Sequence, residues 1–437
     1  MRHPFFGGVH PDGRKELSAG CTPVPAPAPA RVVIPLSQHI GAVCTPLVKA
    51  GDKVKMGQKI GDGEGLCVPV HASVSGTVLA VEPRRHPNGN DVLSVVIEND
   101  FQDTPDQTMT PHPDPSALKS GEIVEIIRQA GIVGMGGAAF PTDVKARSGM
   151  GKVDTLIVNA CECEPYITAD DVLLRARPEQ VVAGVKLLRR VLEPKRTVLA
   201  VEDNKAEAIA ALKRVLASEP SLELKVLPTR YPQGAEKQLI QAVTGRQVPP
   251  GGLPSAVGCA VFNAATSAAV YRAVCLGQSV TRRVVTVTGE AVREPKNLIV
   301  RIGTPFAELV EAAGGLTDDV WKVLSGGPMM GVAQADLDVP VVKGVNAVLC
   351  LSRAQNGETS GPLSCIRCGK CLTVCPMNLQ PLYLYRYEGA GDLEALKRLN
   401  LTDCIECGCC AYACPGKLPL VERFRAGKRE LKEGKKV

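Results

Sequence analysis

Eight of the seventeen cysteines lie in two C-terminal clusters with the spacing of metal ligands. Each cluster reads C-x2-C-x2-C-x3-C-P: the first contains Cys365, Cys368, Cys371 and Cys375, and the second contains Cys404, Cys407, Cys410 and Cys414. Three thiolates at this spacing wrap a tight loop around three corners of an iron–sulfur cubane. Zinc needs only paired C-x2-C units, which do not explain two four-cysteine runs ending in proline. The clusters therefore predict two 4Fe-4S centres.

The proline after each fourth cysteine bears on how the eight ligands divide. Cys375 begins a new chain direction just past Cys371, so it is poorly aimed at the centre of its own run. Two-cluster ferredoxins, which the repeat resembles, cross their fourth ligands in the same way. We expect one centre to be held by Cys365, Cys368, Cys371 and Cys414, and the other by Cys404, Cys407, Cys410 and Cys375. Cys409 breaks the spacing and is expected to be a bystander.

A glycine-rich segment forms a second candidate site. Residues 131–145 read GIVGMGGAAFPTDVK. Adjacent glycines let backbone N–H groups approach a phosphate or a flat ring, and Pro141 opens a predicted helix whose N-terminus favours anions. A Rossmann fingerprint follows a strand, however, whereas Ile123–Ala130 has a helical pattern. The loop alone is as consistent with a structural turn as with a cofactor site.

Polar residues follow a predicted strand further along the chain. The strand Thr155–Val158 is followed at 159–166 by NACECEPY, and open α/β sheets bind ligands at such strand ends. Two more polar segments are Tyr231–Lys237 and Phe262–Thr266.

In this order, the four segments resemble the flavin subunit of respiratory complex I, where they hold FMN and NADH. The resemblance implies binding roles for residues of the glycine loop, with Phe140 facing the dinucleotide: Gly134, Gly136, Gly137, Phe140 and Lys145. In the other segments it implies roles for Asn159, Glu162, Glu164, Tyr231, Gly234, Glu236, Asn263 and Thr266. Cys161 replaces an Asp of that family and Ala235 a Glu, so the dinucleotide contacts differ in detail. We expect Cys161 and Cys163 to be structural thiols, with redox activity as the alternative.

The elements that position these sites divide into several regions. Short alternating runs on both sides of Gly61–Cys67 resemble the halves of a biotinyl/lipoyl-type barrel sandwich. The hairpin between them lacks the lysine that such carriers modify, which favours a structural or docking role. Strands at 155–158, 197–201 and 224–227 alternate with helices and predict a Rossmann-like α/β domain. A hairpin over 284–300 and a helix at 306–313 predict a small α+β module.

The predicted fold class is therefore multidomain, α/β and α+β. We expect a barrel-sandwich β domain at 1–104, a flavin-binding α/β domain at 117–280, the α+β module at 281–352, a helical two-cluster ferredoxin-like module at 356–425 and a basic tail at 426–437. Residues 22–29 alternate proline with small residues and predict a polyproline II spacer with no fold of its own.

Composition narrows the class of protein. A chain of 437 residues with 22% charged residues is globular and suggests about three domains. The basic residues near the C-terminus lack interleaved aromatics, which argues against nucleic-acid binding. We find no signal peptide and no apolar stretch that would insert into a bilayer. We therefore expect a reducing compartment, where cysteines ligate metals rather than form disulfides.

Over nearly all of the chain after residue 20, the arrangement resembles the C subunit of the Rnf electron-transport complex. The segments that carry this resemblance, besides the two cysteine runs and the barrel-like domain, are Glu162–Asp171 and Gly326–Gly331. In that family the 281–352 module is a soluble-ligand-binding β-grasp (SLBB) domain. The resemblance implies a peripheral subunit on the cytoplasmic face of the inner membrane, which exchanges electrons with NAD(H) through FMN and two 4Fe-4S clusters. Its partners would be membrane-embedded subunits that couple this transfer to ion pumping and, indirectly, ferredoxin.

Two alternatives remain open at the level of sequence. A soluble cobalamin reductase of the propanediol-utilisation type has a similar flavin and two-cluster build. A ferredoxin-like carrier or docking adaptor without flavin or NADH chemistry is the other.

Overall fold

In the computed structural model, which describes residues 5–356 and 361–433, the N-terminal domain consists of two small antiparallel sheets. The first has the order β2 (Arg31–Pro35), β8 (Asp91–Asn99), β7 (Gly76–Arg85) and β4 (Lys53–Val54). The second has the order β3 (Thr45–Pro46), β5 (Lys59–Asp62) and β6 (Val70–His71). Inward-facing side chains such as Val32, Ile34 and Ile97 form the core between them. This arrangement agrees with the predicted barrel sandwich.

The second domain has a four-stranded parallel sheet of order β11-β10-β9-β12. Its strands are β9 (Thr155–Ala160), β10 (Arg196–Glu202), β11 (Glu223–Leu227) and β12 (Cys259–Asn263). Alternate residues of β9 face opposite sides, as the period of a strand requires. Leu156 and Val158 join cores that include helix residues such as Leu188 and Ala268, whereas Ile157 packs against Leu239. Helices therefore cover both faces, as the alternating sequence pattern predicts.

Seven α-helices surround this sheet in the described part of the chain. They are α2 (Ser120–Gln129), α3 (Thr142–Gly149), α4 (Ala169–Ala176), α5 (Pro178–Leu192), α6 (Ala206–Leu216), α7 (Glu236–Thr244) and α8 (Ala264–Leu276), with short 3-10 turns η1 (Pro115–Ala117) and η2 (Pro254–Val257). The helical pattern at Ile123–Ala130 corresponds to α2, and the helices expected after the strands at 197–201 and 224–227 are α6 and α7. Pro141 precedes α3, as expected from its preference for helix starts.

The third module is a six-stranded mixed sheet of order β1-β14-β13-β17-β15-β16. Its elements are β13 (Arg282–Thr288), β14 (Lys296–Arg301), β15 (Val320–Ser325), β16 (Val332–Gln334) and β17 (Ala347–Ser352), with α9 (Phe306–Ala312) and α10 (Arg353–Asn356). The predicted hairpin is the antiparallel pair β13–β14. The edge strand β1 (Val24–Pro25) comes from the predicted spacer, so the expectation that 22–29 has no fold of its own is wrong at these two residues. Val24 and Pro25 pair in parallel with Leu298 and Ile299.

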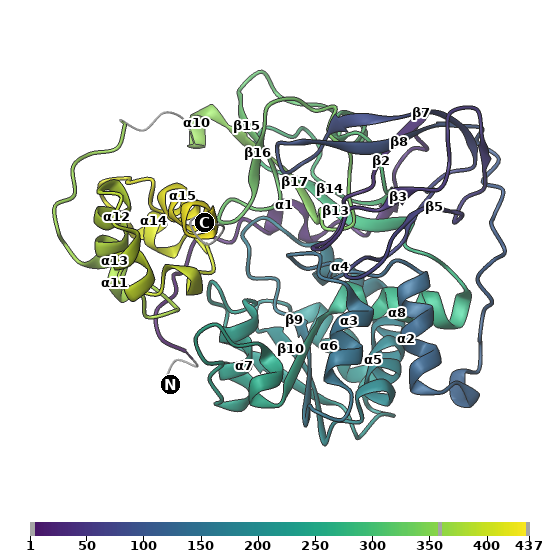
Figure 1. Cartoon of the computed structure of the whole chain (residues 1–437), viewed down its shortest axis with the longest axis horizontal. Helices are drawn as coiled ribbons and strands as arrows, with labels where there is room; N and C mark the ends of the chain where they lie inside the picture. The colour runs from purple at the N-terminus through teal and green to yellow at the C-terminus, as the bar shows by residue number, and fades with distance from the viewer. Residues whose placement is uncertain (1–4, 357–360, 434–437) are drawn as a thin grey trace.

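The C-terminal module is helical and lies at one end of the molecule, drawn in yellow in Figure 1. It contains α11 (Lys370–Thr373), α12 (Pro381–Gly389), α13 (Leu393–Arg398), η3 (Leu401–Asp403), α14 (Cys409–Ala413) and α15 (Leu420–Glu433). Residues 426–433 continue α15, and Leu431 is buried in the module core, so this part of the expected basic tail belongs to the module. The basic residues Lys435 and Lys436 lie outside the described residues.

The N-terminal segment, residues 5–25, links three of these modules before the first sheet begins (Figure 1). Gly8 donates its N–H to Val374 O of the C-terminal module at 2.8 Å, and Val9 bridges Tyr231 of the α/β domain. The short helix α1 (Glu16–Ala19) follows, and then β1. Among the described residues, we find no helix with both the length and the apolar character needed to cross a membrane.

Candidate functional site

The carboxyl edge of the parallel sheet brings two of the predicted residues side by side. Asn159 of β9 is paired with Asn263, the last residue of β12. The side-chain carbonyl of Asn263 accepts from Ala265 N at 2.8 Å and Thr266 N at 3.2 Å, which caps the start of α8. Its amide donates to Asp170 Oδ2 at 2.6 Å. The strand end and the helix start are thus held in one hydrogen-bonded unit.

The glycine loop folds over this edge. Gly134 N donates to Phe140 O at 2.9 Å, which closes the loop, and Met135 N donates to Thr266 Oγ1 at 2.9 Å. A Cβ on Gly136 would lie 2.7 Å from Asn263 Nδ2, whereas a Cβ on Gly137 would meet nothing within 4 Å. Both glycines are exposed, so their backbone is open to a flat ring or a phosphate. This geometry fits the flavin that the sequence predicts, and Phe140 lies half-buried at the end of the loop.

Lys145 and Glu236 form the other side of the edge. The Lys145 ammonium lies 2.7 Å from Glu236 Oε1 and donates to Val261 O at 3.1 Å. Lys145 lies on α3 and Glu236 begins α7. The ion pair therefore joins two helices on different sides of the sheet.

The acidic loop after β9 is organised by Asn159 and Glu162. Asn159 Nδ2 donates to Gly234 O at 2.8 Å, and Cys161 N donates to Asn159 Oδ1 at 3.0 Å. Glu162 accepts from Asp170 N at 2.8 Å and Asp171 N at 3.3 Å, at the start of α4, where the helix dipole favours a negative charge. The loop, the Gly234 turn and α4 are held together in this way.

Glu164 faces the third module. Its carboxylate accepts from Met330 N at 2.8 Å, and Met329 N lies 3.4 Å away. Burial raises the pKa of Glu164 to about 7, although these N–H groups act in the opposite direction. The Gly326–Gly331 segment, which we noted only as a family feature, is therefore in direct contact with the acidic loop.

Tyr231 lies at the contact between the α/β domain and the C-terminal module. Its side chain is buried, and its hydroxyl donates to Cys407 O of the C-terminal module at 2.7 Å. Cys163 and Met329 pack in the same apolar cluster, together with Cys407 and Cys409. Tyr231 thus joins the α/β domain to the second cysteine run.

Three residues that were not singled out as site residues lie at the same edge. Asp170 binds Asn263, and burial together with nearby Glu162 raises its pKa to about 7. Arg283 donates to Met135 O of the glycine loop at 3.2 Å, and burial lowers its pKa to about 10. Cys163 Sγ accepts from Gly234 N at 3.3 Å. Asp170 begins a helix and Arg283 lies within a strand, so neither has a local signal that separates it from a capping or a structural residue.

A cavity of about 420 Å³ opens beside the glycine loop, where Met135 and Asp170 form part of its wall. Four arginines also line it: Arg177, Arg272, Arg282 and Arg283. This concentration of positive charge favours anionic ligands next to the loop.

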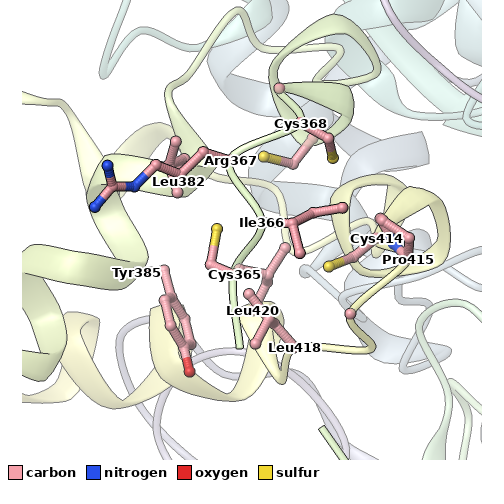
Figure 2. Close-up of a pocket in the computed structure, with 13 residues that line it drawn as sticks. Cys365, Ile366, Arg367, Cys368, Leu382, Tyr385, Cys414, Pro415, Leu418 and Leu420 are labelled. Carbon is pink, nitrogen blue, oxygen red and sulfur yellow. The ribbon is translucent and has the colours of Figure 1, made fainter. Parts of the chain in front are cut away.

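The eight predicted cluster cysteines divide between two cavities in the C-terminal module. One is lined by Cys365, Cys368, Cys371 and Cys414, hereafter the outer cysteine set. Figure 2 shows the side chains of Cys365, Cys368 and Cys414 turned toward a shared space. The other is lined by Cys375, Cys404, Cys407 and Cys410, hereafter the inner cysteine set. In each cavity, the fourth cysteine of one run thus joins the first three of the other, the donor set that a cubane requires.

Left-handed backbone conformations shape both loops in the same way. Arg367 and Glu406 each have a φ of 55°, and Gly369 and Gly408 have φ values of 76° and 79°. These residues occupy equivalent positions in the two runs and curl each loop so that its first three cysteines face one cavity.

The two sets differ in exposure. Cys365 and Cys368 are exposed, whereas Cys375, Cys407 and Cys410 are buried. Cys409, the expected bystander, is fully buried and lies among the residues that line the inner cavity.

Comparisons with known protein families agree with this architecture. The chain matches the RnfC barrel sandwich hybrid domain at residues 3–102, the Nuo51 FMN-binding domain at 127–272, the SLBB domain at 284–333 and the 4Fe-4S dicluster domain at 364–417. The predicted fold class and its order of modules are confirmed. A flavin-binding domain and a two-cluster iron–sulfur domain are both present.

Two solved structures share part of the fold. They are NAD+-reducing [NiFe]-hydrogenase in the H2-reduced state, with a TM-score of 0.51 and 22% identity, and the same enzyme in the air-oxidized state, with a TM-score of 0.52 and 21% identity. The similarity covers 74% and 72% of this chain, respectively, and 64% of each hydrogenase chain. At this identity, the likeness concerns the fold alone.

Two curated relatives are much closer in sequence. The C subunit of the Na(+)-translocating ferredoxin:NAD(+) oxidoreductase complex of Acetobacterium woodii is 46% identical over 429 residues, which cover 98% of this chain and 97% of that protein. The C subunit of the ion-translocating oxidoreductase complex of Serratia proteamaculans is 45% identical over 430 residues, which cover 98% of this chain but only 61% of that longer protein. The chain therefore belongs to the C-subunit family of the ion-translocating ferredoxin:NAD oxidoreductases, the Rnf complexes.

Proposed function

We propose that this chain is the peripheral subunit through which an Rnf-type complex exchanges electrons with NAD(H) on the cytoplasmic face of the membrane. FMN binds at the carboxyl edge of the parallel sheet, against Gly136, Gly137, Asn159 and Asn263. The inner cysteine set holds the 4Fe-4S cluster next to the flavin, and the outer set holds the second cluster.

The observation that carries this proposal is the contact between the flavin domain and the inner cysteine set. Tyr231 donates to Cys407 O at 2.7 Å, and Cys163, which accepts from Gly234 N, packs in the same apolar cluster. A Cβ on Gly408 would lie 2.9 Å from Met329 O, next to the residues that bind Glu164. The acidic loop, the Gly326–Gly331 segment and the inner cysteine run therefore meet in one packed region, which favours electron exchange between flavin and inner cluster.

A bound flavin supplies the conversion between a two-electron hydride and single electrons that iron–sulfur clusters accept. The chain itself orients and shields the site. Asn159 and Asn263 fix the strand ends, the ion pair of Lys145 and Glu236 holds two helices at the edge, and Arg283 holds the glycine loop by Met135 O. Glu164 of the acidic loop, with a pKa of about 7, holds or releases a proton beside the Gly326–Gly331 segment near neutral pH.

The outer cysteine set is suited to exchange electrons with another subunit. Cys365 and Cys368 are exposed, and the neighbouring apolar side chains of Leu363 and Ile366 are 59% and 69% exposed. Exposed apolar side chains beside a redox centre favour docking of a partner. We infer that a membrane-embedded subunit of the complex docks here and that ferredoxin connects only through such subunits.

Freeze-quench EPR of the anaerobically purified chain, mixed with NADH, tests this order. The cluster held by the inner set is expected to become reduced first. The Cys407→Ser and Cys368→Ser variants assign the two signals, because each removes one ligand from one set. Reduction of the outer cluster first, or reduction that does not depend on FMN, would contradict the proposal.

The membrane face is tested by labelling an engineered surface cysteine with an impermeant maleimide in right-side-out and inverted vesicles. Labelling confined to inverted vesicles is expected. Labelling in intact right-side-out vesicles would overturn the cytoplasmic placement while leaving the electron path untouched.

A further inference from the structure

Three side chains with metal-binding atoms converge in the barrel-sandwich domain, away from both cysteine sets. His39 follows β2, Cys44 precedes β3, and Cys67 lies at the end of the Gly61–Cys67 hairpin. Their ligand atoms all lie within 4.8 Å of one another. The Cys44 sulfur is 3.4 Å from the Cys67 sulfur and 3.8 Å from His39 Nε2.

These separations match the edges of a tetrahedral zinc site. With Zn–S bonds of about 2.3 Å and Zn–N bonds of about 2.0 Å, two sulfur ligands lie about 3.8 Å apart, and a sulfur and a nitrogen lie about 3.5 Å apart. The observed 3.4 Å and 3.8 Å lie within about 0.3–0.4 Å of these two edges, and the third pair, Cys67 Sγ and the His39 ring nitrogen, lies within 4.8 Å. Two thiols and an imidazole are also the soft and borderline donors that select zinc over magnesium or calcium.

The histidine ring is oriented for this role. Nδ1 lies 3.3 Å from Ile40 O, which can only accept, so Nδ1 carries a proton, and the N–H of Val68 points at Nε2, which therefore carries a lone pair. A backbone carbonyl that accepts from the second ring nitrogen is the usual support of a zinc-binding histidine. Val68 N also donates to Nε2 at 3.2 Å, a long bond that the metal would replace.

Burial separates the sulfur atoms from solvent. Cys44 and Cys67 are 2% and 1% exposed, whereas His39 is half-buried at the rim. Buried thiols are poorly accessible to oxidants, and the half-buried imidazole leaves a route for an ion.

We propose that His39, Cys44 and Cys67 bind one Zn²⁺ ion, with a fourth coordination position open to water. The Gly61–Cys67 hairpin is the one in which lipoyl-type carriers place their modified lysine. In this chain, the ion fixes that hairpin to the turn after β2 and so makes it a rigid support.

The support contacts the glycine loop of the flavin domain. Ile40 N donates to Ala139 O at 3.3 Å, directly after His39. The buried Lys343 ammonium donates to Pro69 O at 2.8 Å and to Gly131 O at 2.7 Å, and its backbone N–H donates to Gln38 Oε1 at 3.0 Å. The residues flanking two zinc ligands thus hold both ends of the glycine loop, so removal of the ion is expected to loosen that loop.

The test is metal analysis of the full chain, purified anaerobically with its iron–sulfur clusters from zinc-supplemented cells and dialysed against EDTA. We expect about one zinc per chain and a zinc X-ray absorption spectrum with two sulfur neighbours near 2.3 Å and nitrogen or oxygen near 2.0 Å. In Cys44→Ser and Cys67→Ser the zinc affinity should fall by about tenfold or more, since even the loss of a supporting contact weakens such sites by that factor, and the variants should lose zinc during dialysis against EDTA.

His39→Gln is the variant least able to disturb the core, because His39 lies at the rim, and it should also lose zinc. Cys275→Ser, which changes a buried thiol on α8, is the matched control and should keep it. Unchanged iron content and circular dichroism establish that each variant is folded. Equal zinc in wild type and Cys67→Ser, a zinc spectrum with four sulfur neighbours, or a Cys44–Cys67 disulfide found by mass spectrometry would each overturn the proposal.

Discussion

The hydroxyl of Tyr231 donates a 2.7 Å hydrogen bond to the backbone carbonyl of Cys407, and this bond crosses from the flavin domain to the inner cysteine set. In Tyr231→Phe, the buried carbonyl loses this donor, which costs about 1–3 kcal/mol of stability. The hydroxyl dipole beside the inner cysteine set is also lost, so the reduction potential of the inner cluster should move while that of the outer cluster stays constant. EPR redox titration measures both potentials.

Tyr385→Phe is the matched control, because Tyr385 lines the outer cavity. It should leave the potential of the inner cluster unchanged. Equal shifts of both clusters in Tyr231→Phe would show that the contact is not specific to the inner set.

The glycine loop offers a pair of substitutions with different expected outcomes. Gly136→Ala places a Cβ 2.7 Å from Asn263 Nδ2, so it should disturb the loop even without cofactor and lower the melting temperature. Gly137→Ala meets nothing within 4 Å, so it should fold normally and reduce only FMN retention and NADH-dependent cluster reduction. Dithionite, which bypasses the flavin, should reduce the clusters in both variants. Full FMN content in Gly137→Ala would show that the glycine loop is not part of the flavin site.

The division of cysteines between the cavities predicts a crossed effect of single substitutions. Cys375→Ser should perturb the EPR signal of the cluster held by Cys404, Cys407 and Cys410, because Cys375 lines their cavity. Cys414→Ser should perturb the other signal in the same experiment. If each substitution instead affected the cluster of its own run, the two cavities would not represent the ligand sets.

Glu164 predicts a pH dependence of stability. Its pKa is about 7 in the folded protein, against an ordinary value of 4.5. Between these values the unfolded chain loses this proton while the folded chain keeps it, so stability falls as the pH rises toward 7 and then stays level. The total effect is at most about 3 kcal/mol.

Glu164→Gln should remove this part of the pH dependence, measured as the melting temperature between about pH 5.5 and 8.5 under anaerobic conditions. Glu179→Gln, at an exposed position of α5, should keep the wild-type profile. Parallel profiles for wild type and Glu164→Gln would exclude Glu164 as the titrating group.

Local sequence patterns were sufficient to predict the strand, the strand ends and the cysteine loops that form the candidate sites. The run Thr155–Val158 is buried on both faces, as a central parallel strand must be, and it forms the first four residues of β9. The strand-end rule correctly brings Asn159 and Asn263 to one edge. The spacing of the cysteines and their two prolines predicted the sets that line the two cavities.

Contacts between distant segments could not be predicted in this way. Tyr231 lies in a segment that resembles a cofactor loop, but its orientation depends on packing against Cys407. Strand β1 has only two residues and forms by pairing with the edge of β14. A strand this short has no alternating pattern in the sequence by which it could be predicted. Asp170 and Arg283 meet the site only because α4 and β13 are packed beside it.

The position of the N-terminal segment has a consequence for biosynthesis. Gly8 and Val9 bond to Val374 and Tyr231, and a Cβ on Gly7 would lie 2.6 Å from Cys375 O. During translation, Gly7 and Gly8 leave the ribosome before Val374 and Cys375, which they contact in the folded chain. The barrel and flavin domains can fold in turn as they emerge, since domains generally fold as units during synthesis. The contacts of Gly7 and Gly8 with Val374 and Cys375 form only once the cysteine-rich module has been made.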